Sequence, residues 1–157
     1  MKNYYSYKIK ANYVLIVEDN GCIVEIAFDK RKINGTEKET DIIKKAAMQL
    51  EEYFAGKRKS FDFPINAQGS EFQKRVWTAL QTIPYGELRS YKQIAEKIGN
   101  PKASRAVGMA NNKNPLPIVV PCHRVIGSNG KLVGYAYGLD MKEYLINIEK
   151  TNSLLQK

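Results

Sequence analysis

The stretch SYKQIAEKIGNPKASRAVGMAN, residues 90–111, decides the fold of the second half of the chain. Ser90 and Tyr91 open a short helix with an apolar face, and the Gly-Asn-Pro triplet at 99–101 breaks it. A second helix can follow from Ala103 to about Asn111. Two short helices across a tight glycine turn predict a helix-turn-helix, although helical hairpins in general produce the same pattern.

The segment before this motif also predicts a helix. Ser70 with Gln73 three residues later has the pattern of a capping box, and apolar residues at helical spacing follow over residues 71–81. Trp77 lies on the apolar stripe of this helix. We therefore expect Trp77 in the hydrophobic core rather than as a platform for a ligand.

The beginning of the chain predicts a small sheet. β-Branched residues are frequent in 14–17 and 22–28, and Asn20-Gly21 between the two runs favours a hairpin turn. Alternation along the second run places four apolar side chains on one face: Cys22, Val24, Ile26 and Phe28. Cys22 is therefore expected as a packed apolar residue rather than a reactive thiol.

A helix and a linker follow this sheet. Apolar residues at helical spacing from Ile42 to Phe54 predict a helix that ends at Gly56 and covers the sheet. Residues 57–69 are polar, contain proline and include a candidate strand at residues 61–65. This segment is the best candidate for a linker, so we predict two domains, residues 1–66 and 67–157.

The charge balance indicates a polyanionic partner. The 157 residues include 25 Lys and Arg against 16 Asp and Glu, a formal net charge of +9. Nucleic acid is the leading candidate for such a partner. A Lys-rich solvated surface is the alternative that charge alone leaves open.

Composition also argues against several classes of protein. No apolar run approaches the roughly 18 residues of a membrane helix, and the first residues lack the apolar core of a secretory signal, so a cytoplasmic protein is expected. Two cysteines and one histidine are too few for a disulfide framework or a Cys/His zinc site. Because no carboxylate cluster has metal-ligand spacing either, we expect no metal and no cofactor.

The stretch NPLPIVVPCHR, residues 114–124, contains the candidate nucleophile. Its prolines predict a stiff, buried, extended segment that ends at Pro121. Cys122 follows, beside His123 and Arg124, and positive charge near a thiol lowers the thiol pKa. Neighbouring side chains of an extended chain point in opposite directions, so contact between Cys122 and His123 requires a turn or a bridging water. A buried structural cysteine is the alternative that these residues leave open.

The chain after this stretch supplies a long loop and a last helix. Residues 127–138 are rich in Gly and Tyr, and loops of this length often line a pocket. Asp140 with Glu143 resembles a helix start. Glu149 lies near the C-terminal end of the helix that follows.

Residues 114–149 resemble the active-site region of the O6-alkylguanine-DNA alkyltransferases, also called methylated-DNA–protein-cysteine methyltransferases. The PCHRV motif of that family is complete at residues 121–125, and the similarity extends upstream to about Ser70 through IPYGELRSYKQIAEKIGNPKASRAVG, residues 83–108. The resemblance implies an α/β (α+β) fold. A small N-terminal ribonuclease H-like α/β lobe would precede a helical C-terminal lobe that contains the helix-turn-helix.

The activity that the resemblance implies is DNA repair by direct, irreversible transfer of a methyl or other alkyl group from O6-alkylguanine to Cys122. One molecule would repair one lesion, as a stoichiometric methylated-DNA–protein-cysteine S-methyltransferase. In the implied relay, Glu149 orients His123, which activates Cys122 through water. Asn114 braces the turn that holds the site, and Tyr91 donates a proton to the departing base. Repair of O4-alkylthymine is left open.

The partner that the resemblance implies is double-stranded DNA containing alkylated guanine. The resemblance also implies that the protein is a monomer and does not bind a membrane. Arg105 corresponds to the family's arginine finger, a side chain that enters the base stack after the damaged nucleotide rotates out. The small residues near it on the second helix would let that helix fit into the narrow minor groove. The implied DNA-binding residues are Arg105, Ala103, Ser104, Ala106, Gly108 and Arg124. The implied pocket for the alkylated base consists of Tyr91, Val125, Tyr135, Ala136, Tyr137 and Lys142.

Two other functions compete with this interpretation. A non-catalytic DNA-lesion-binding protein on the same fold is the main alternative, and Cys122 separates the two because the related alkyltransferase-like proteins lack the acceptor cysteine. A cysteine hydrolase with Cys122, His123 and Glu149 as a triad explains neither the helix-turn-helix nor the net charge.

Overall fold

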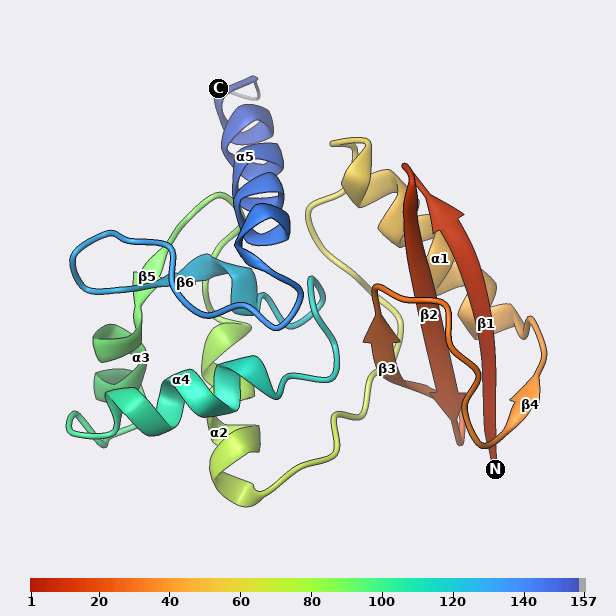
Figure 1. Ribbon diagram of the computed structural model, residues 1–157, viewed down its shortest axis with the longest axis horizontal. Helices are drawn as coiled ribbons and strands as arrows, with labels where there is room; N and C mark the ends of the chain where they lie inside the picture. The colour runs from red at the N-terminus through yellow and green to blue at the C-terminus, as the bar shows by residue number, and fades with distance from the viewer. Residues whose placement is uncertain (156–157) are drawn as a thin grey trace. The chain divides into compact units, whose positions relative to one another are not determined.

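The computed structural model describes residues 1–155. The chain divides into two compact units, Met1–Gln68 and Gly69–Lys157, and the division falls within the polar segment 57–69. Figure 1 shows a sheet with one helix in the first unit and mainly helices in the second. The predicted fold class, a small α/β lobe followed by a helical lobe with a helix-turn-helix, is confirmed.

The sheet of the first unit has the strand order β3-β2-β1-β4. Its strands are β1 (Lys2–Ile9), β2 (Asn12–Asp19), β3 (Cys22–Ala27) and β4 (Thr36–Glu37). β1, β2 and β3 form an antiparallel meander, and β4 pairs in parallel with β1. Asn20 and Gly21 turn the chain between β2 and β3 with positive φ of 51° and 78°, which confirms the predicted hairpin. β1 is not among the predicted strands.

An irregularity in β3 changes which of its side chains are buried. Val17 of β2 pairs with Glu25 and the next residue pairs with Ile23, so one extra residue of β3 stands between these pairs. Ile23 is consequently buried, as is Ile26, whereas Cys22 is only half-buried. The prediction that residues 22, 24, 26 and 28 share one face is therefore wrong, because a bulge interrupts the alternation.

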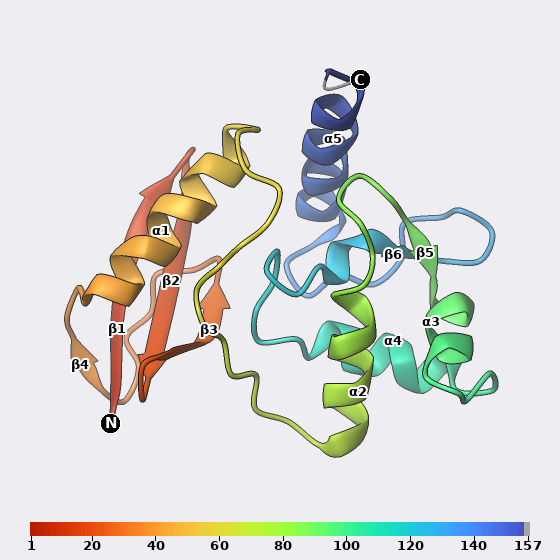
Figure 2. The ribbon, with the colours of Figure 1, turned by 180° about the vertical axis from the view of Figure 1, so that it is seen from behind.

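Helix α1 (Asp41–Phe54) lies across one face of the sheet, as Figure 2 shows from behind. The backbone N–H of Ile43 donates to Oγ1 of Thr40 at 3.4 Å, which caps the helix. The apolar face predicted from the sequence is buried apart from Ile42, which is half-buried, and the chain leaves the helix at Gly56 with a φ of 76°. The predicted helix is confirmed.

The candidate strand at residues 61–65 is reduced to one bridge between Ile23 and Ile65. The backbone N–H of Ile23 donates to the carbonyl of Pro64 at 2.9 Å, and that of Asn66 donates to the carbonyl of Ile23 at 3.0 Å. Pro64 has no N–H with which to extend a ladder, which is why the prediction of a full strand is wrong.

Helix α2 (Glu71–Leu80) opens the second unit with the predicted capping box. Gln73 N–H donates to Oγ of Ser70 at 3.1 Å, and Ser70 N–H donates to Oε1 of Gln73 at 2.9 Å. Trp77 is 3% exposed, and its indole Nε1 donates to the carbonyl of Ala110 at 2.9 Å. Trp77 is thus a core residue that joins α2 to α4 (Ser104–Asn112).

The helix-turn-helix consists of α3 (Tyr91–Lys97) and α4. Ser90 and Gln93 form a second capping box at the start of α3. Gly99 has a φ of 81°, a conformation in which glycine ends helices at no steric cost. α2, α3 and α4 pack against one another, so the motif rests on its own small core.

A short parallel ladder and a last helix complete the second unit. β5 (Arg89–Ser90) pairs with β6 (Val125–Ile126), which places the start of α3 beside the segment after Cys122. Helix α5 (Leu139–Leu155) begins next to Asp140, as predicted. Within residues 1–155, every helix is too short or too polar to cross a bilayer.

Candidate active site

The side chain of Asn114 stabilises a turn of the chain just before the candidate nucleophile. Its Nδ2 donates to the carbonyl of Val120 at 2.8 Å, and its Oδ1 accepts from the N–H of Leu116 at 2.9 Å. Between them Ile118 has a φ of 74°, a conformation that a β-branched residue adopts at a cost of about 1–3 kcal/mol. The predicted extended segment is therefore wrong: the buried run is a turn wrapped around the Asn114 side chain.

Cys122, His123 and Arg124 form a single 3-10 turn after this curl. Such a turn has three residues per revolution, so the three side chains leave in different directions. Their exposed fractions are 4%, 0% and 7%. The chain thus turns at this point instead of running extended, and the turn directs His123 towards Glu149.

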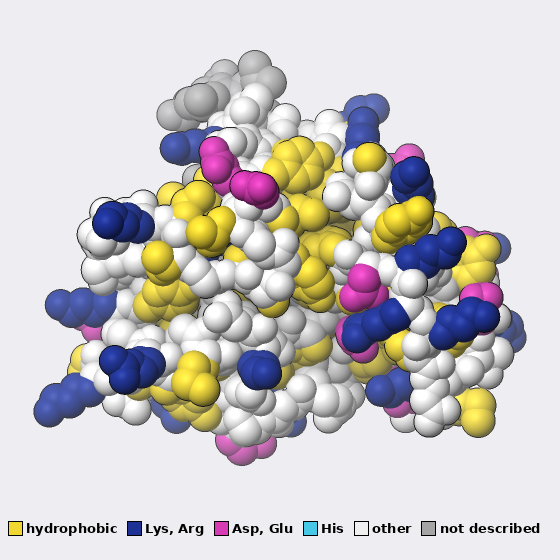
Figure 3. Space-filling view, viewed as in Figure 1, with side chains coloured by type: hydrophobic (Ala, Val, Ile, Leu, Met, Phe, Trp, Pro, Cys, Tyr) yellow, Lys and Arg dark blue, Asp and Glu magenta, His cyan; other side chains and the backbone are white. Residues whose placement is uncertain are grey.

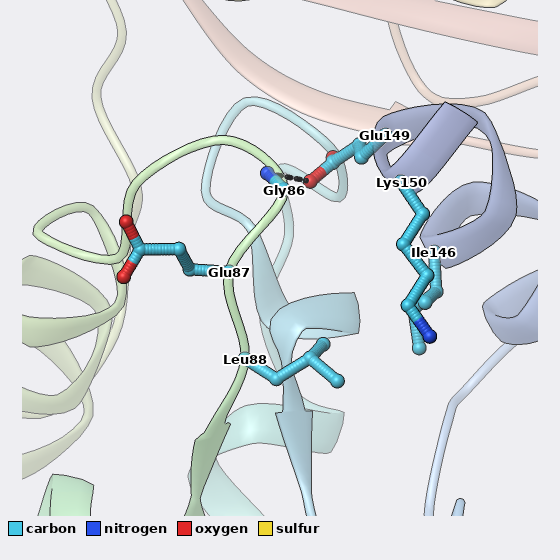
Figure 4. Close-up of a pocket in the computed structure, with 6 residues that line it drawn as sticks. All are labelled: Gly86, Glu87, Leu88, Ile146, Glu149 and Lys150. Atoms are coloured by element: carbon cyan, nitrogen blue, oxygen red, sulfur yellow. Dashed lines mark hydrogen bonds between the residues drawn. The ribbon is translucent and has the colours of Figure 1, made fainter. Parts of the chain in front are cut away.

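The carboxylate of Glu149, on α5, binds the imidazole of His123 in the protein interior. Nε2 of His123 lies 2.5 Å from Oε2 of Glu149, and the carboxylate also accepts from the N–H of Gly86 at 3.1 Å. Figure 4 shows the Gly86 nitrogen directed at Glu149, beside a small pocket of about 30 Å³. These contacts hold the pKa of Glu149 down at about 2 against the effect of burial. Glu149 is therefore a carboxylate at neutral pH.

Arg124 points into the protein and not towards a DNA surface. Its Nε donates to Oε1 of Glu149 at 2.8 Å, its Nη2 to Oε2 at 3.2 Å and its Nη1 to the carbonyl of Ile83 at 2.6 Å. The predicted role of Arg124 as a DNA contact is therefore wrong. The sequence neighbours of Arg124 do not reveal that its partner is a glutamate within α5.

Burial raises the pKa of the Cys122 thiol to about 11, and Asn114 and the charge of Lys142 offset this only in part. The predicted lowering of this pKa is wrong, because the positive charge next in sequence is turned towards Glu149. Burial also lowers the pKa of His123, which favours the neutral imidazole. Cys122 thus rests as a thiol, and a base has to remove its proton during reaction.

Tyr91 and Lys142 bind the same loop carbonyls. The Tyr91 hydroxyl donates to the carbonyl of Val133 at 2.9 Å, and Nζ of Lys142 donates to that oxygen at 2.9 Å and to the carbonyl of Gly134 at 3.3 Å. The Lys142 side chain is fully buried, which lowers its pKa to about 8. The structure thus brings two predicted pocket residues, from α3 and α5, to one loop.

The remaining predicted pocket residues differ in their surroundings. Val125 is fully buried, and Tyr135 is half-buried. Burial raises the pKa of Tyr135 well above its usual value, and the adjacent Cys122 adds to this effect. Tyr137 packs edge-on against Tyr135, with ring centroids 6.1 Å apart. Ala136 is exposed between them.

The predicted DNA-binding residues of α4 lie along one helix. Arg105 and Ala106 are exposed, and Ala103, Ser104 and Gly108 are half-buried. Figure 3 shows many Lys and Arg side chains over the region of α3 and α4. The sequence around these helices supplies Arg89, Lys92, Lys97, Lys102, Arg105 and Lys113, against a single acidic residue, Glu96. The side chains on α4 stay predictions as DNA contacts.

Asn111 is a site residue that sequence reasoning missed. It is 1% exposed, and its Nδ2 donates to the carbonyl of Cys122 at 3.2 Å. It therefore connects the end of α4 to the main chain of the candidate nucleophile. Its position near a helix end, where asparagine is common, gave no signal of this contact.

Residues 1–155 contain no group of three or more His, Cys, Asp or Glu side chains placed to hold a metal ion. The candidate site is built from a thiol, an imidazole, a carboxylate and a guanidinium.

A buried cysteine beside a histidine, in a unit that contains a helix-turn-helix, fits a class of DNA-binding proteins with a reactive cysteine. Two sequence families match the chain: "6-O-methylguanine DNA methyltransferase, ribonuclease-like domain" over residues 3–67, and "6-O-methylguanine DNA methyltransferase, DNA binding domain" over residues 71–151. The chain belongs to the 6-O-methylguanine DNA methyltransferase family.

Curated relatives and solved structures agree with this assignment. The chain is 63% identical over 109 residues to the methylated-DNA–protein-cysteine methyltransferase of Methanosarcina acetivorans, covering 69% of this chain and 70% of the relative. It is 51% identical over 144 residues to that of Methanosarcina mazei, covering 88% and 91%. The crystal structure of Mycobacterium tuberculosis OGT in complex with DNA superposes with a TM-score of 0.89 at 40% identity, over 96% of this chain and 94% of that one.

Proposed function

We propose that this protein repairs DNA by transferring a methyl or other alkyl group from the O6 atom of guanine to Sγ of Cys122. The observation that carries the proposal is the buried Cys122, which shares a 3-10 turn with a histidine that Glu149 binds. Residues 67–157 form the DNA-binding and active-site domain, and residues 1–66 support it. The protein acts as a monomer on double-stranded DNA.

The transfer is a displacement at the alkyl carbon. The S–C bond forms as the C–O6 bond breaks, and the electron pair of the broken bond goes to guanine. Because Glu149 is ionised, we assign the proton of the neutral imidazole to Nε2 of His123, which leaves the lone pair on Nδ1 to receive the thiol proton through water. Tyr91 gives a proton to the departing guanine and regains one from solvent. The thioether product has no easily displaced group, so each molecule repairs one lesion.

The alkylated nucleotide has to leave the duplex before it reaches Cys122, because this cysteine is 4% exposed. Rotation out of the stack costs a few kcal/mol. Arg105, exposed on α4, enters the stack in place of the base, while the small residues beside it allow close approach to the minor groove. Contacts from Lys and Arg to phosphates make the affinity dependent on salt.

Mass spectrometry of the intact protein after exposure to duplex containing O6-methylguanine tests the proposal. We expect the mass of one methyl group per protein molecule even with excess DNA, on the peptide that contains Cys122. Cys22, which is half-buried in the first unit, serves as the internal control and stays unmodified. An unchanged mass with tight binding would favour a lesion-binding protein, and methylation of Cys22 alone would reject the assignment of the acceptor.

Arg105→Ala should slow methyl transfer from duplex by at least about tenfold and leave transfer from free O6-methylguanine base unchanged. The reason is that the finger stabilises the extruded state, which the free base does not need, and about 1.4 kcal/mol corresponds to a factor of ten. Arg31→Ala is the matched control, because it removes an arginine from the first unit, where Arg31 pairs with Asp29 at 3.3 Å. Equal slowing on both substrates would contradict the role of Arg105 as a finger.

A further inference from the structure

The Glu149 carboxylate binds Arg124 as well as His123. Two nitrogens of the guanidinium reach the two carboxylate oxygens, at 2.8 and 3.2 Å, and the third reaches the carbonyl of Ile83 at 2.6 Å. Such a planar fork fixes the orientation of a carboxylate more firmly than a single donor does. The position of the acceptor for His123 therefore depends on Arg124.

We propose that Arg124 is a positioning residue of the proton relay, which fixes the Glu149 carboxylate and balances its charge so that His123 stays neutral and able to accept the thiol proton. The inference rests on the proposed function for its purpose.

The charges around His123 explain why a balancing cation is needed. A buried carboxylate 2.5 Å from an imidazole draws a proton onto the ring, and an imidazolium cannot serve as a base. The other charged groups that act on His123 are Arg124, on its own turn, and Lys142 from α5. The ring of Tyr85, a residue of the turn before β5, lies 5.6 Å from the Arg124 guanidinium. Burial lowers the pKa of His123 most, and the charges of Arg124 and Lys142 add to this effect, opposing Glu149. Arg124 is the cation bonded directly to the same carboxylate.

The turn before β5 binds both the Arg124 guanidinium and the Glu149 carboxylate. Ile83 supplies the carbonyl for Arg124, and Gly86 supplies the N–H for Glu149, as Figure 4 shows for the latter contact. Gly86 has a φ of 81°, and a Cβ there would lie 2.1 Å from Oγ of Ser153 on α5. The turn and α5 are therefore in close contact, so the guanidinium and the carboxylate are fixed relative to each other.

The experiment uses the fact that His123 is the single histidine of the chain. Its imidazole resonances report its pKa directly by NMR in the full-length protein. The variants are Arg124→Gln, which keeps hydrogen-bond donors and removes the charge, and Arg124→Lys, which keeps the charge and loses the fork. Arg58→Gln is the control, because Arg58 forms an ion pair with Glu52 in the first unit. Transfer from free O6-methylguanine base is followed against pH in parallel.

In Arg124→Gln we expect the pKa of His123 to rise by about one pH unit or more, and the acid limb of the pH–rate profile to move by the same amount. In Arg124→Lys we expect an unchanged pKa with transfer slowed about tenfold, because one ammonium cannot bind both oxygens as the fork does. Arg58→Gln should match the unchanged protein in both measurements.

An unshifted His123 pKa in Arg124→Gln would overturn the proposal, since a purely structural arginine would lower the rate at every pH alike. If Arg124→Gln does not fold, the test rests on Arg124→Lys. Methyl transfer by Arg124→Lys at the rate of the unchanged protein would then overturn the proposal. The titration also separates this inference from the proposed function: a protein that never becomes methylated still reports whether Arg124 controls the proton affinity of His123.

Discussion

Cys122→Ala should abolish methyl transfer completely and leave the affinity for duplex containing O6-methylguanine within about twofold of the unchanged protein. The thiol is the only proposed acceptor, so no partial activity remains without it. The DNA contacts proposed for α4 do not involve this side chain, and its 4% exposure leaves little of it to touch the duplex. Affinity is measured by fluorescence anisotropy at one fixed salt concentration, because phosphate contacts make it salt-dependent.

Cys22→Ala is the matched control for this variant. It removes the other cysteine, half-buried in β3, and we expect full methyl transfer with one methyl group per molecule. Methyl transfer by Cys122→Ala would show that the acceptor is a different residue. A collapse of DNA affinity in Cys122→Ala alone would show that this cysteine contributes to recognition and not only to transfer.

The helix-turn-helix was predictable because its signals are local. Ser90 and Gln93 form the capping box within three residues, and Gly99 ends α3 with the positive φ that glycine favours. The hairpin at Asn20-Gly21 belongs to the same category. β1 escaped prediction because its tyrosine-rich sequence has no clear alternation, and its place in the sheet depends on pairing with β2 and β4.

The directions of side chains at the site were not predictable, because they depend on contacts far along the chain. The surroundings of Cys122 looked positively charged in sequence, yet the 3-10 turn sends Arg124 to Glu149, 25 residues away. Burial then decides the pKa of the thiol. Ile118 likewise adopts a positive φ because Asn114 binds the main chain on both sides of it, a contact that no local propensity reveals.

Glu149→Gln should destabilise the second unit by about 3–5 kcal/mol at pH 7, because it leaves the buried Arg124 charge without its counter-ion. Methyl transfer should fall by at least about a hundredfold, since a neutral amide orients His123 less well and does not stabilise the imidazolium that forms. Unfolding in urea is followed by the fluorescence of Trp77, the single tryptophan of the chain, which lies in the core of this unit. Glu87→Gln is the control, because Glu87 forms an exposed ion pair with Arg89.

The effect of Glu149→Gln should depend on pH in one direction. The pKa of Glu149 is lowered from 4.5 to about 2 in the folded protein, so its carboxylate stabilises the fold above pH 4.5 and loses this effect as the pH falls towards 2. The difference in unfolding free energy between the unchanged protein and Glu149→Gln should therefore shrink by about 3 kcal/mol between pH 6 and pH 2. A pH-independent difference, or a variant as stable as Glu87→Gln at pH 7, would show that the Glu149 carboxylate does not hold His123 and Arg124 as the structure has them.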